Sequence, residues 1–311
     1  MSLNDLLQGS PFPLFNFEEI KYISELGSGA NGVVYKANIK DKDYAVKEYN
    51  LNGWNDEEEF YNSILYELKV LKKINTLKYS VNTYGISYKE YRDNVQILII
   101  MELLVSVGDL FDYTQKDQFW KVFNNENGKD FVTFYPDQNN QRYIYTMNNT
   151  IKKNVTIMLL EALIELHLQN IIHADIKSAN IIYSLTNRKK IIKLVDFGAS
   201  YFSKKIIDIN CKAGTVGYMA PEQYEYKLNK KSDVYSLTAT IIEFWNGELW
   251  GDGNNYKDCR DELQRGLTVI KNLYPNLGKV LSSGIDESPV ERPTALRLLY
   301  NVKNAFKHDH I

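Results

Sequence analysis

Alternating hydrophobic and polar positions in the first third of the chain predict an antiparallel sheet. Short apolar runs are separated by a glycine-rich turn after residue 26 and by a polar turn at 40–42. The expected strands cover 20–25, 33–38, 44–47, 81–88 and 95–102. Consecutive strands joined by such short turns pair antiparallel, so this region is not a Rossmann unit.

Helical periodicity replaces this alternation further along the chain. An acidic run at 56–59 begins a predicted helix, because carboxylates favour the positive end of the helix dipole, and Ile64, Leu68 and Leu71 form its apolar stripe. Beyond Gly108 the pattern is mainly helical. Its clearest helices are expected at 151–168 and 232–245, with short apolar segments near 171 and at 191–195. A polar stretch at 116–149 predicts a long insertion.

Composition limits the class of protein. Of the 311 residues, 44% are hydrophobic and 24% are charged, which is typical of a globular domain with a large core. The net charge of −2, with Lys and Arg spread along the chain, favours neither a nucleic-acid partner nor an anionic membrane. Two cysteines, Cys211 and Cys259, are too few for a disulfide framework or a zinc cluster, which indicates a reducing compartment.

The hydrophobic pattern also indicates where in the cell the protein is expected. No stretch has the apolar length that crosses a bilayer, so no membrane segment is expected. The first residues lack a basic region and are interrupted by Pro11 and Pro13, which does not fit a signal peptide. We therefore expect a cytoplasmic protein, or one in a host cytosol if its source is a pathogen or a virus.

A glycine-rich segment lies between the first two expected strands. It consists of Gly27, Ser28, Gly29, Ala30, Asn31 and Gly32. Glycines let backbone N–H groups approach phosphates without a Cβ in the way. The same pattern also occurs in ordinary hairpins, and the lack of a following helix argues against dinucleotide binding.

Lys47 ends the third expected strand, where a lysine is usually a solvated charge. Glu67 lies 20 positions later (67 − 47 = 20), on the apolar side of the predicted helix. An unpaired carboxylate there is costly to bury, so a Lys47–Glu67 ion pair would account for both residues.

Two further segments carry residues suited to phosphoryl chemistry. In one, Asp175 could orient a hydroxyl nucleophile, Lys177 could neutralise charge on the moving phosphoryl group, and Asn180 could ligate a metal. His173 in the same segment is expected to be a packed, structural histidine. In the other, Asp196 precedes Phe197-Gly198 and offers a carboxylate to Mg²⁺.

These four elements, in this order and at these separations, resemble the eukaryotic protein kinase family. The match runs from about Phe17 to Phe306. The resemblance implies an α+β, two-lobed protein kinase fold, with a small antiparallel-sheet lobe carrying one helix and a larger, mainly helical lobe. The implied divisions are an extension at 1–16, a small lobe at about 17–104, a large lobe at about 105–306, the insertion at about 116–149 and a tail at 307–311.

The resemblance also implies a role for each residue. The glycine-rich segment covers the phosphates of ATP, and Lys47 contacts the α- and β-phosphates while pairing with Glu67. Asp175 is the catalytic aspartate, assisted by Lys177. Asn180 and Asp196 hold Mg²⁺, with Mn²⁺ as an alternative. The residues implied to line the adenine site are Leu26, Val34, Ala45, Met101, Glu102, Leu104 and Ile182.

Further matches lie outside the chemistry. The segment 214–222 resembles the loop that positions a peptide substrate, and its Glu222 is expected to pair with Arg292. Asp233 resembles the helix aspartate that anchors the catalytic loop. Glu243, in the same predicted helix, occupies a position that often reads basic residues of the substrate.

Two departures from the family pattern stand out. Ala174 replaces the arginine that usually precedes the catalytic aspartate and receives an activation-loop phosphate. The chain thus resembles the non-RD kinases, and catalysis is expected not to depend on phosphorylation between 196 and 222. Thr238 replaces a helix glycine, a change expected to affect packing only.

The sequence therefore predicts a kinase that moves the γ-phosphate of Mg-ATP to Ser or Thr of a protein substrate. Lys177 and Thr215 favour Ser/Thr over Tyr acceptors. The alternatives are a tyrosine kinase, a pseudokinase that serves as a binding scaffold, and a kinase of small molecules, which the segment at 214–222 disfavours. A regulatory partner is compatible with the sequence, which does not identify one.

Overall fold

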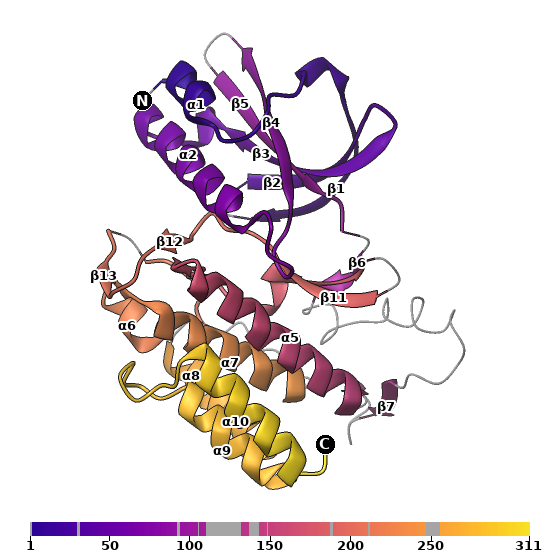
Figure 1. Ribbon diagram of the computed structural model, residues 1–311, viewed down its shortest axis with the longest axis vertical. Coiled ribbons are helices and arrows are strands. Elements are labelled where there is room, and N and C mark those ends of the chain that lie inside the picture. Colours follow the sequence, from indigo (N-terminus) through magenta and orange to yellow (C-terminus); the bar gives the residue numbers. More distant parts are fainter. Residues whose placement is uncertain are drawn as a thin grey trace. The chain divides into compact units, whose positions relative to one another are not determined.

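The chain forms two compact units. The computed structural model describes residues 2–29, 32–91, 94–104, 106–109, 132–136, 143–147, 149–186, 189–210, 212–246 and 256–311. The first unit contains residues 1–105 and 196–200, and the second contains residues 106–195 and 201–311 (Figure 1). The expected insertion at 116–149 lies largely outside the described residues.

A five-stranded antiparallel sheet dominates the first unit. Its strands are β1 (Ile20–Gly29), β2 (Gly32–Ile39), β3 (Lys42–Asn50), β4 (Thr83–Tyr91) and β5 (Asn94–Glu102). They lie in the order β1-β2-β3-β5-β4, so β4 is an edge strand. Ala37, Val46, Leu98 and Ile100 from three of these strands are buried in one apolar cluster. The alternation in the sequence thus correctly predicts this sheet, although most strands extend beyond the predicted limits.

Helix α2 (Glu57–Ile74) belongs to the same unit and follows the short 3-10 turn Leu51–Gly53. The Asp56 side chain accepts the Glu59 N–H at 2.7 Å and caps its first turn, as the acidic run predicts. The apolar stripe predicted from the sequence, including Ile64, Leu68 and Leu71, is buried. Glu67 lies on this buried side of the helix.

The segment before β1 packs onto the first unit. Helix α1 (Leu3–Gly9) begins with a capping box between Ser2 and Asp5, and its Leu6 is fully buried. It lies beside α2 (Figure 1). The chain then pairs with the edge strand β4, because Phe15 N–H donates to the Ile86 carbonyl at 2.7 Å and Ile86 N–H donates to the Pro13 carbonyl at 3.0 Å. The 3-10 turn Phe17–Glu19 leads into β1.

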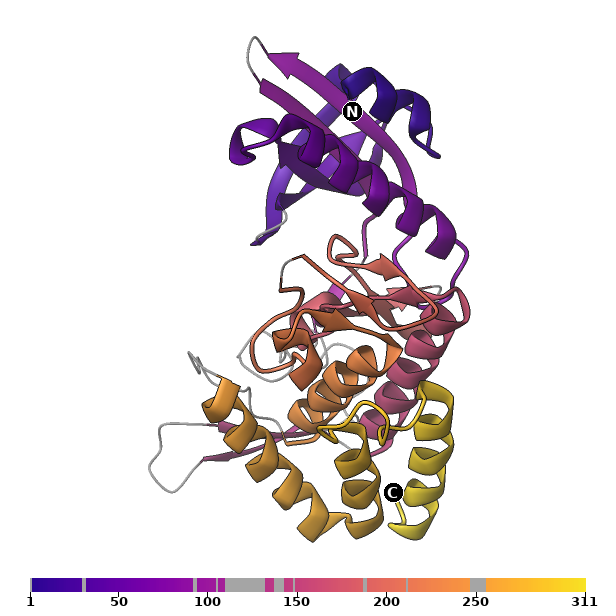
Figure 2. The same ribbon diagram turned by 90° about the vertical axis from the view of Figure 1, so that its left-hand side faces the viewer.

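The second unit is built around a buried helix. Helix α7 (Lys230–Asn246) is buried at every position from Ser232 to Trp245, so other elements of this unit surround it. Helices α5 (Asn149–Leu168), α8 (Tyr256–Leu273) and α9 (Pro275–Gly284) pack against it, and α10 (Ala295–His308) packs against α5 and α9 (Figure 2). The short helix α6 covers Pro221–Tyr224.

Short strands complete the second unit. One three-stranded sheet has the order β11-β10-β6, from Lys189–Leu194, Ile181–Thr186 and Ser106–Asp109. The two-stranded pairs are β9 (Ile171–Ile172) with β12 (Tyr201–Phe202), β13 (Ile207–Asp208) with β14 (Lys227–Leu228), and β7 (Val132–Pro136) with β8 (Tyr143–Met147). A 3-10 turn covers Ser178–Asn180. An antiparallel sheet in one unit and mainly helices in the other confirm the predicted α+β class.

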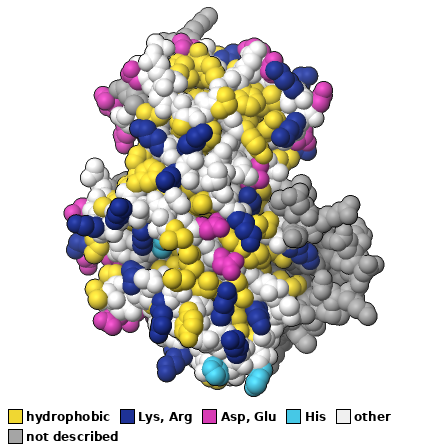
Figure 3. All heavy atoms as spheres, viewed as in Figure 1, with side chains coloured by type: hydrophobic (Ala, Val, Ile, Leu, Met, Phe, Trp, Pro, Cys, Tyr) yellow, Lys and Arg dark blue, Asp and Glu magenta, His cyan; other side chains and the backbone are white. Residues whose placement is uncertain are grey.

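Charged side chains do not segregate by sign on the face drawn in Figure 3. Lys and Arg are interspersed there with Asp and Glu among the described residues. Within the described ranges, every helix is too short or too polar to cross a lipid bilayer. Cys259 is a buried free thiol, whereas Cys211 lies outside the described residues.

Candidate active site

Lys47 and Glu67 meet inside the first unit. Lys47 Nζ lies 3.0 Å from Glu67 Oε1 and 2.8 Å from Asp196 Oδ1. Burial alone would lower the pKa of Lys47, but the Glu67 and Asp196 carboxylates raise it well above its usual value. The ammonium therefore remains charged, and it joins β3, α2 and the segment at 196–200.

The structure gives a steric reason for one glycine of the loop. Gly32 has φ +128°, and a Cβ there would overlap the carbonyl oxygen of Glu48 in β3. Gly29 pairs with Gly32 at the end of the β1–β2 ladder. A Cβ on Gly27 would meet no other atom within 4 Å, so there is space beside the strand at this position. Ser28 lies in β1 between these glycines, whereas Ala30 and Asn31 lie outside the described residues.

Most residues implied to contact adenine belong to adjacent strands of the first unit. Ala45 pairs with Met101 across β3 and β5, and Val34 pairs with Lys47 across β2 and β3. Leu26 in β1 is 51% exposed. Leu104 follows β5 and is partly buried. Ile182 lies on β10 of the second unit.

Glu102 at the end of β5 is tied to the chain just before β4. Its carboxylate accepts the Asn82 N–H at 2.8 Å, and its own N–H donates to the Asn82 carbonyl at 2.9 Å. The Glu102 side chain thus fixes the end of the strand, which leaves any adenine contact to the backbone.

The Asp175 carboxylate is held by three side chains of the second unit. The Thr215 hydroxyl donates to Oδ1 at 2.7 Å, and Asn180 Nδ2 donates to Oδ2 at 3.1 Å. Lys177 Nζ lies 3.2 Å from Oδ2 and donates to the Thr215 hydroxyl at 2.8 Å. Residues that are 40 positions apart are thereby joined into one network.

Asn180 and Asp196 offer ligands that suit a small, hard cation. Asn180 uses Nδ2 for its contacts with Asp175, including the carbonyl at 2.9 Å, which leaves its amide oxygen for a metal. The Asp196 side chain is 32% exposed, so its carboxylate is accessible. No cluster of three or more His, Cys, Asp and Glu residues suited to a metal occurs in the described part of the chain. Mg²⁺ needs few protein ligands because it retains water molecules, and each of the two side chains by itself offers an oxygen of the kind that it binds.

Asp233 fixes the backbone that precedes Asp175. It accepts the N–H groups of His173 and Ala174, each at 2.9 Å, and the His167 ring at 3.1 Å. Ala174 has φ +67°, a conformation that an L residue seldom adopts without support. His173 is fully buried, and its Nε2 lies 3.2 Å from the Val195 carbonyl, which agrees with a structural role.

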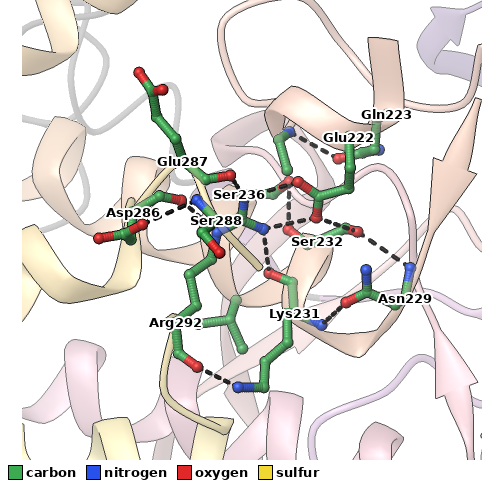
Figure 4. Close-up of polar contacts among 12 residues, drawn as sticks. Glu222, Gln223, Asn229, Lys231, Ser232, Ser236, Asp286, Glu287, Ser288 and Arg292 are labelled. Carbon is green, nitrogen blue, oxygen red and sulfur yellow. Dashed lines mark hydrogen bonds and ion pairs between the residues drawn. The ribbon is translucent and has the colours of Figure 1, made fainter. Parts of the chain in front are cut away.

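Figure 4 shows the buried ion pair between Glu222 and Arg292. The two guanidinium nitrogens Nη1 and Nη2 each donate to one Glu222 oxygen at 2.7 Å. Arg292 also donates to the carbonyls of Asp286, Lys231 and Glu287, and its side chain is fully buried. Two segments that are 70 positions apart are joined by this pair.

Glu243 is not placed as the sequence predicts. It is fully buried, and its carboxylate accepts the Tyr218 hydroxyl at 3.0 Å and the Ser178 hydroxyl at 3.2 Å. The expectation that it reads basic residues of the substrate does not agree with this burial. Sequence reasoning missed both partners, because a Tyr and a Ser far apart in sequence give no sign that they share a carboxylate.

Sequence reasoning also missed Tyr49. Its hydroxyl donates to Glu67 Oε2, the oxygen that Lys47 does not use. The alternation of side chains along β3 is the signal that could have found it, because residues 47 and 49 lie on the same face of the strand.

Comparisons with known proteins find kinases among the relatives of this chain. A probable serine/threonine-protein kinase of Dictyostelium discoideum is 28% identical over 92% of this chain and 19% of its own length. The serine/threonine-protein kinase STY46 of Arabidopsis thaliana is 23% identical over 94% of this chain and 45% of its own length. The leaf rust 10 disease-resistance locus receptor-like protein kinase-like 1.1 of Arabidopsis thaliana is 27% identical over 88% of this chain and 41% of its own length.

These alignments span less than half of each of these relatives. The family model described as "Protein kinase domain" matches residues 20–309, which is most of the chain and includes every residue of both networks around Lys47 and Asp175. The chain belongs to the protein kinase domain family.

Proposed function

We propose that this chain is a serine/threonine protein kinase that transfers the γ-phosphate of ATP to Ser or Thr hydroxyls of a protein substrate. The family generally uses ATP with Mg²⁺. The observation that carries the proposal is the Asp175 carboxylate, held by the Thr215 hydroxyl at 2.7 Å and by Lys177 at 3.2 Å. A carboxylate fixed in this way can accept the proton of an attacking hydroxyl, while Lys177 balances phosphoryl charge.

Most residues that serve ATP in this proposal belong to the first unit, whereas Asn180 belongs to the second. Lys47 contacts the α- and β-phosphates, and the turn between β1 and β2 supplies backbone N–H groups. Asp196 and Asn180 ligate Mg²⁺, which when bound neutralises charge on the phosphates. Met101, Glu102 and Leu104 at the end of β5 face adenine, and apolar residues of the neighbouring strands contact the ring.

We further propose that this kinase, as a non-RD member, acts without phosphorylation of its activation segment. Ala174 is 2% exposed and lies in an apolar cluster with Ile172, Ile209, Ala213 and Leu228. Two of these residues, Ile209 and Ala213, belong to the activation segment itself, which is the stretch from Asp196 to Glu222. The pairings Tyr201 with Ile172 and Ile207 with Leu228 hold the same segment. Apolar packing thus takes over a task that a phosphate and an arginine could perform.

The test is phosphate transfer from radiolabelled ATP with Mg²⁺ to a generic protein substrate, followed by identification of the labelled amino acid. We expect label on Ser or Thr with the wild-type chain and a loss of at least 100-fold with Asp175→Ala, in line with the effect of removing a catalytic base. Label on Tyr would contradict the acceptor class. A wild-type chain that is folded, binds ATP and transfers nothing would favour the pseudokinase alternative.

A further inference from the structure

Strand β3 presents two buried polar side chains to helix α2. Lys47 and Tyr49 are two positions apart, so they point to the same face of the strand. They are 4% and 5% exposed, and Glu67 opposite them is 4% exposed. Three polar groups that are so deeply buried are stable only if they bond to one another.

Each oxygen of Glu67 receives its own donor from β3. Lys47 Nζ lies 3.0 Å from Oε1, and the Tyr49 hydroxyl donates to Oε2. Burial and the Glu67 carboxylate raise the pKa of Tyr49 well above its usual value, so the hydroxyl keeps its proton and remains a donor. The ammonium of Lys47 also lies 5.0 Å from the centre of the Tyr49 ring.

Two donors restrict the carboxylate more than one donor does. With Lys47 alone, Glu67 could turn about its terminal bond and bond through either oxygen, because that torsion is soft. A second donor from the same strand selects one orientation and leaves Oε1 for Lys47. It also satisfies an oxygen that would otherwise be desolvated without a hydrogen bond.

We propose that Tyr49 is a positioning residue for the phosphoryl transfer proposed above: its hydroxyl fixes Glu67, which in turn fixes the ammonium of Lys47. This inference rests on the proposed function. A role in packing alone makes a different prediction, because replacement by Phe keeps the ring and removes only the hydroxyl.

The matched control is Tyr61, another buried tyrosine of the same unit. It lies on α2 and is 1% exposed, and burial together with the Glu57 carboxylate, not Glu67, raises the pKa of its hydroxyl. Tyr49→Phe and Tyr61→Phe each remove one buried hydroxyl, so a general loss of stability affects both. Only the first removes a donor to Glu67.

The experiment is a double-mutant cycle on kcat/KM for ATP with Tyr49→Phe, Glu67→Gln and both together, at a temperature where thermal unfolding shows each variant folded. We expect Tyr49→Phe to lower kcat/KM about tenfold, the effect of losing one charge-assisted hydrogen bond, and Tyr61→Phe to change it less than about twofold. The double variant should be no worse than Glu67→Gln alone, because the hydroxyl acts only through Glu67.

Each other outcome is decisive. Losses that multiply in the double variant, or equal losses for Tyr49→Phe and Tyr61→Phe, would show that Tyr49 only packs. A Tyr49→Phe chain that does not fold would also overturn the proposal, since the hydroxyl would then serve folding. If instead Glu67→Gln is as active as the wild type, the Lys47–Glu67 pair is not needed for transfer, and the proposal for Tyr49 fails while the proposed function stands. An inactive wild type would contradict the proposed function itself.

Discussion

The hydroxyl of Thr215 donates to Asp175 Oδ1 at 2.7 Å and at the same time accepts a hydrogen bond from Lys177 at 2.8 Å. One side chain of the segment at 214–222 thus completes the surroundings of the proposed catalytic base. The position of this segment and the orientation of the base are therefore coupled.

The first prediction concerns that hydroxyl. Thr215→Val keeps the shape of the side chain but leaves one Asp175 oxygen and the Lys177 ammonium each short of a partner. We expect kcat to fall about 10- to 100-fold, the equivalent of one charge-assisted hydrogen bond. Thr215→Ser should retain most of the activity because it keeps the hydroxyl. Steady-state kinetics with one protein substrate measures both, and equal activity of the two variants would contradict the assigned coupling.

The second prediction concerns the apolar cluster around Ala174. Treatment with a phosphatase, or the pair Tyr201→Phe and Ser203→Ala, should leave kcat within about twofold, because packing and not a phosphate pair holds the segment. Ile209→Asn places a polar group at a position that is 6% exposed in this cluster, and it should lower kcat at least fivefold. Phosphorylation of a peptide measures kcat of the treated chain and of each variant.

The outcome that contradicts the second prediction is equally clear. A tenfold loss after phosphatase treatment, reproduced by the two substitutions, would mean that cations elsewhere in the chain receive a phosphate. Mass spectrometry of the untreated chain is the control, because it establishes whether any phosphate was present to remove.

The third prediction concerns stability and the pair in Figure 4. Arg292→Lys cannot form two parallel bonds to Glu222 or reach the three carbonyls that the guanidinium contacts. We expect the free energy of unfolding to fall by about 3 kcal/mol, as for other broken buried ion pairs. Arg297→Lys, at an exposed position of α10, should change it by less than about 0.5 kcal/mol. Urea unfolding compares the two, and similar losses would refute the importance of the buried pair.

The fourth prediction is a pH dependence of stability. Lys152 is 8% exposed, donates to the Trp245 carbonyl at the end of α7 at 2.8 Å, and burial lowers its pKa to about 8. The unfolded chain then binds more protons than the folded chain between that pH and the ordinary pKa of 10.5, so stability rises with pH through this window. Below about pH 8 both states are protonated and the cost of burial is fully present.

This cost is measured against a variant without the charge. The free energy of unfolding of the wild type, relative to Lys152→Met, should increase by about 2–3 kcal/mol from pH 7.5 to 10.5. Thr156→Val also removes a partner of Trp245, but it lacks a titratable group, so its difference from the wild type should not vary with pH. A flat difference for Lys152→Met would mean that the folded chain keeps the charge as readily as the unfolded chain.

The sequence predicts those features of the structure that depend on the types of residues and on their spacing along the chain. The sheet of the first unit and helices α2, α5 and α7 follow from periodicity, and the Lys47–Glu67 pair follows from the cost of burying a single charge. The Glu222–Arg292 pair was expected only from the resemblance of its segment to the kinase family. Periodicity is a local property, and the Lys47–Glu67 pair joins residue types that attract each other, so these features needed little tertiary information.

The sequence does not predict side-chain contacts that depend on which helices and strands pack together. The partners of Glu243 and the second donor to Glu67 are neutral hydroxyls, which occur on many surfaces and give no signal by type. Thr238 was expected to alter packing, and the structure shows how. A side chain on Gly284 in α9 would lie 3.0 Å from Thr238 Cβ, so a glycine on one helix makes room for the threonine on the other.

The segment before β1 has a consequence for solubility. Strand β4 lies at the edge of its sheet, and an uncovered edge is a template on which other chains can add a strand. Pro13 and Phe15 occupy two backbone positions of that edge at Ile86, and the Phe15 ring fills the space beside Gly85 that a side chain would need. The family match begins only at residue 20, so a chain cut to the match would expose this edge and the apolar side of α2 together. We expect such a chain to self-associate: the first residues act as a cover against aggregation as well as a part of the core.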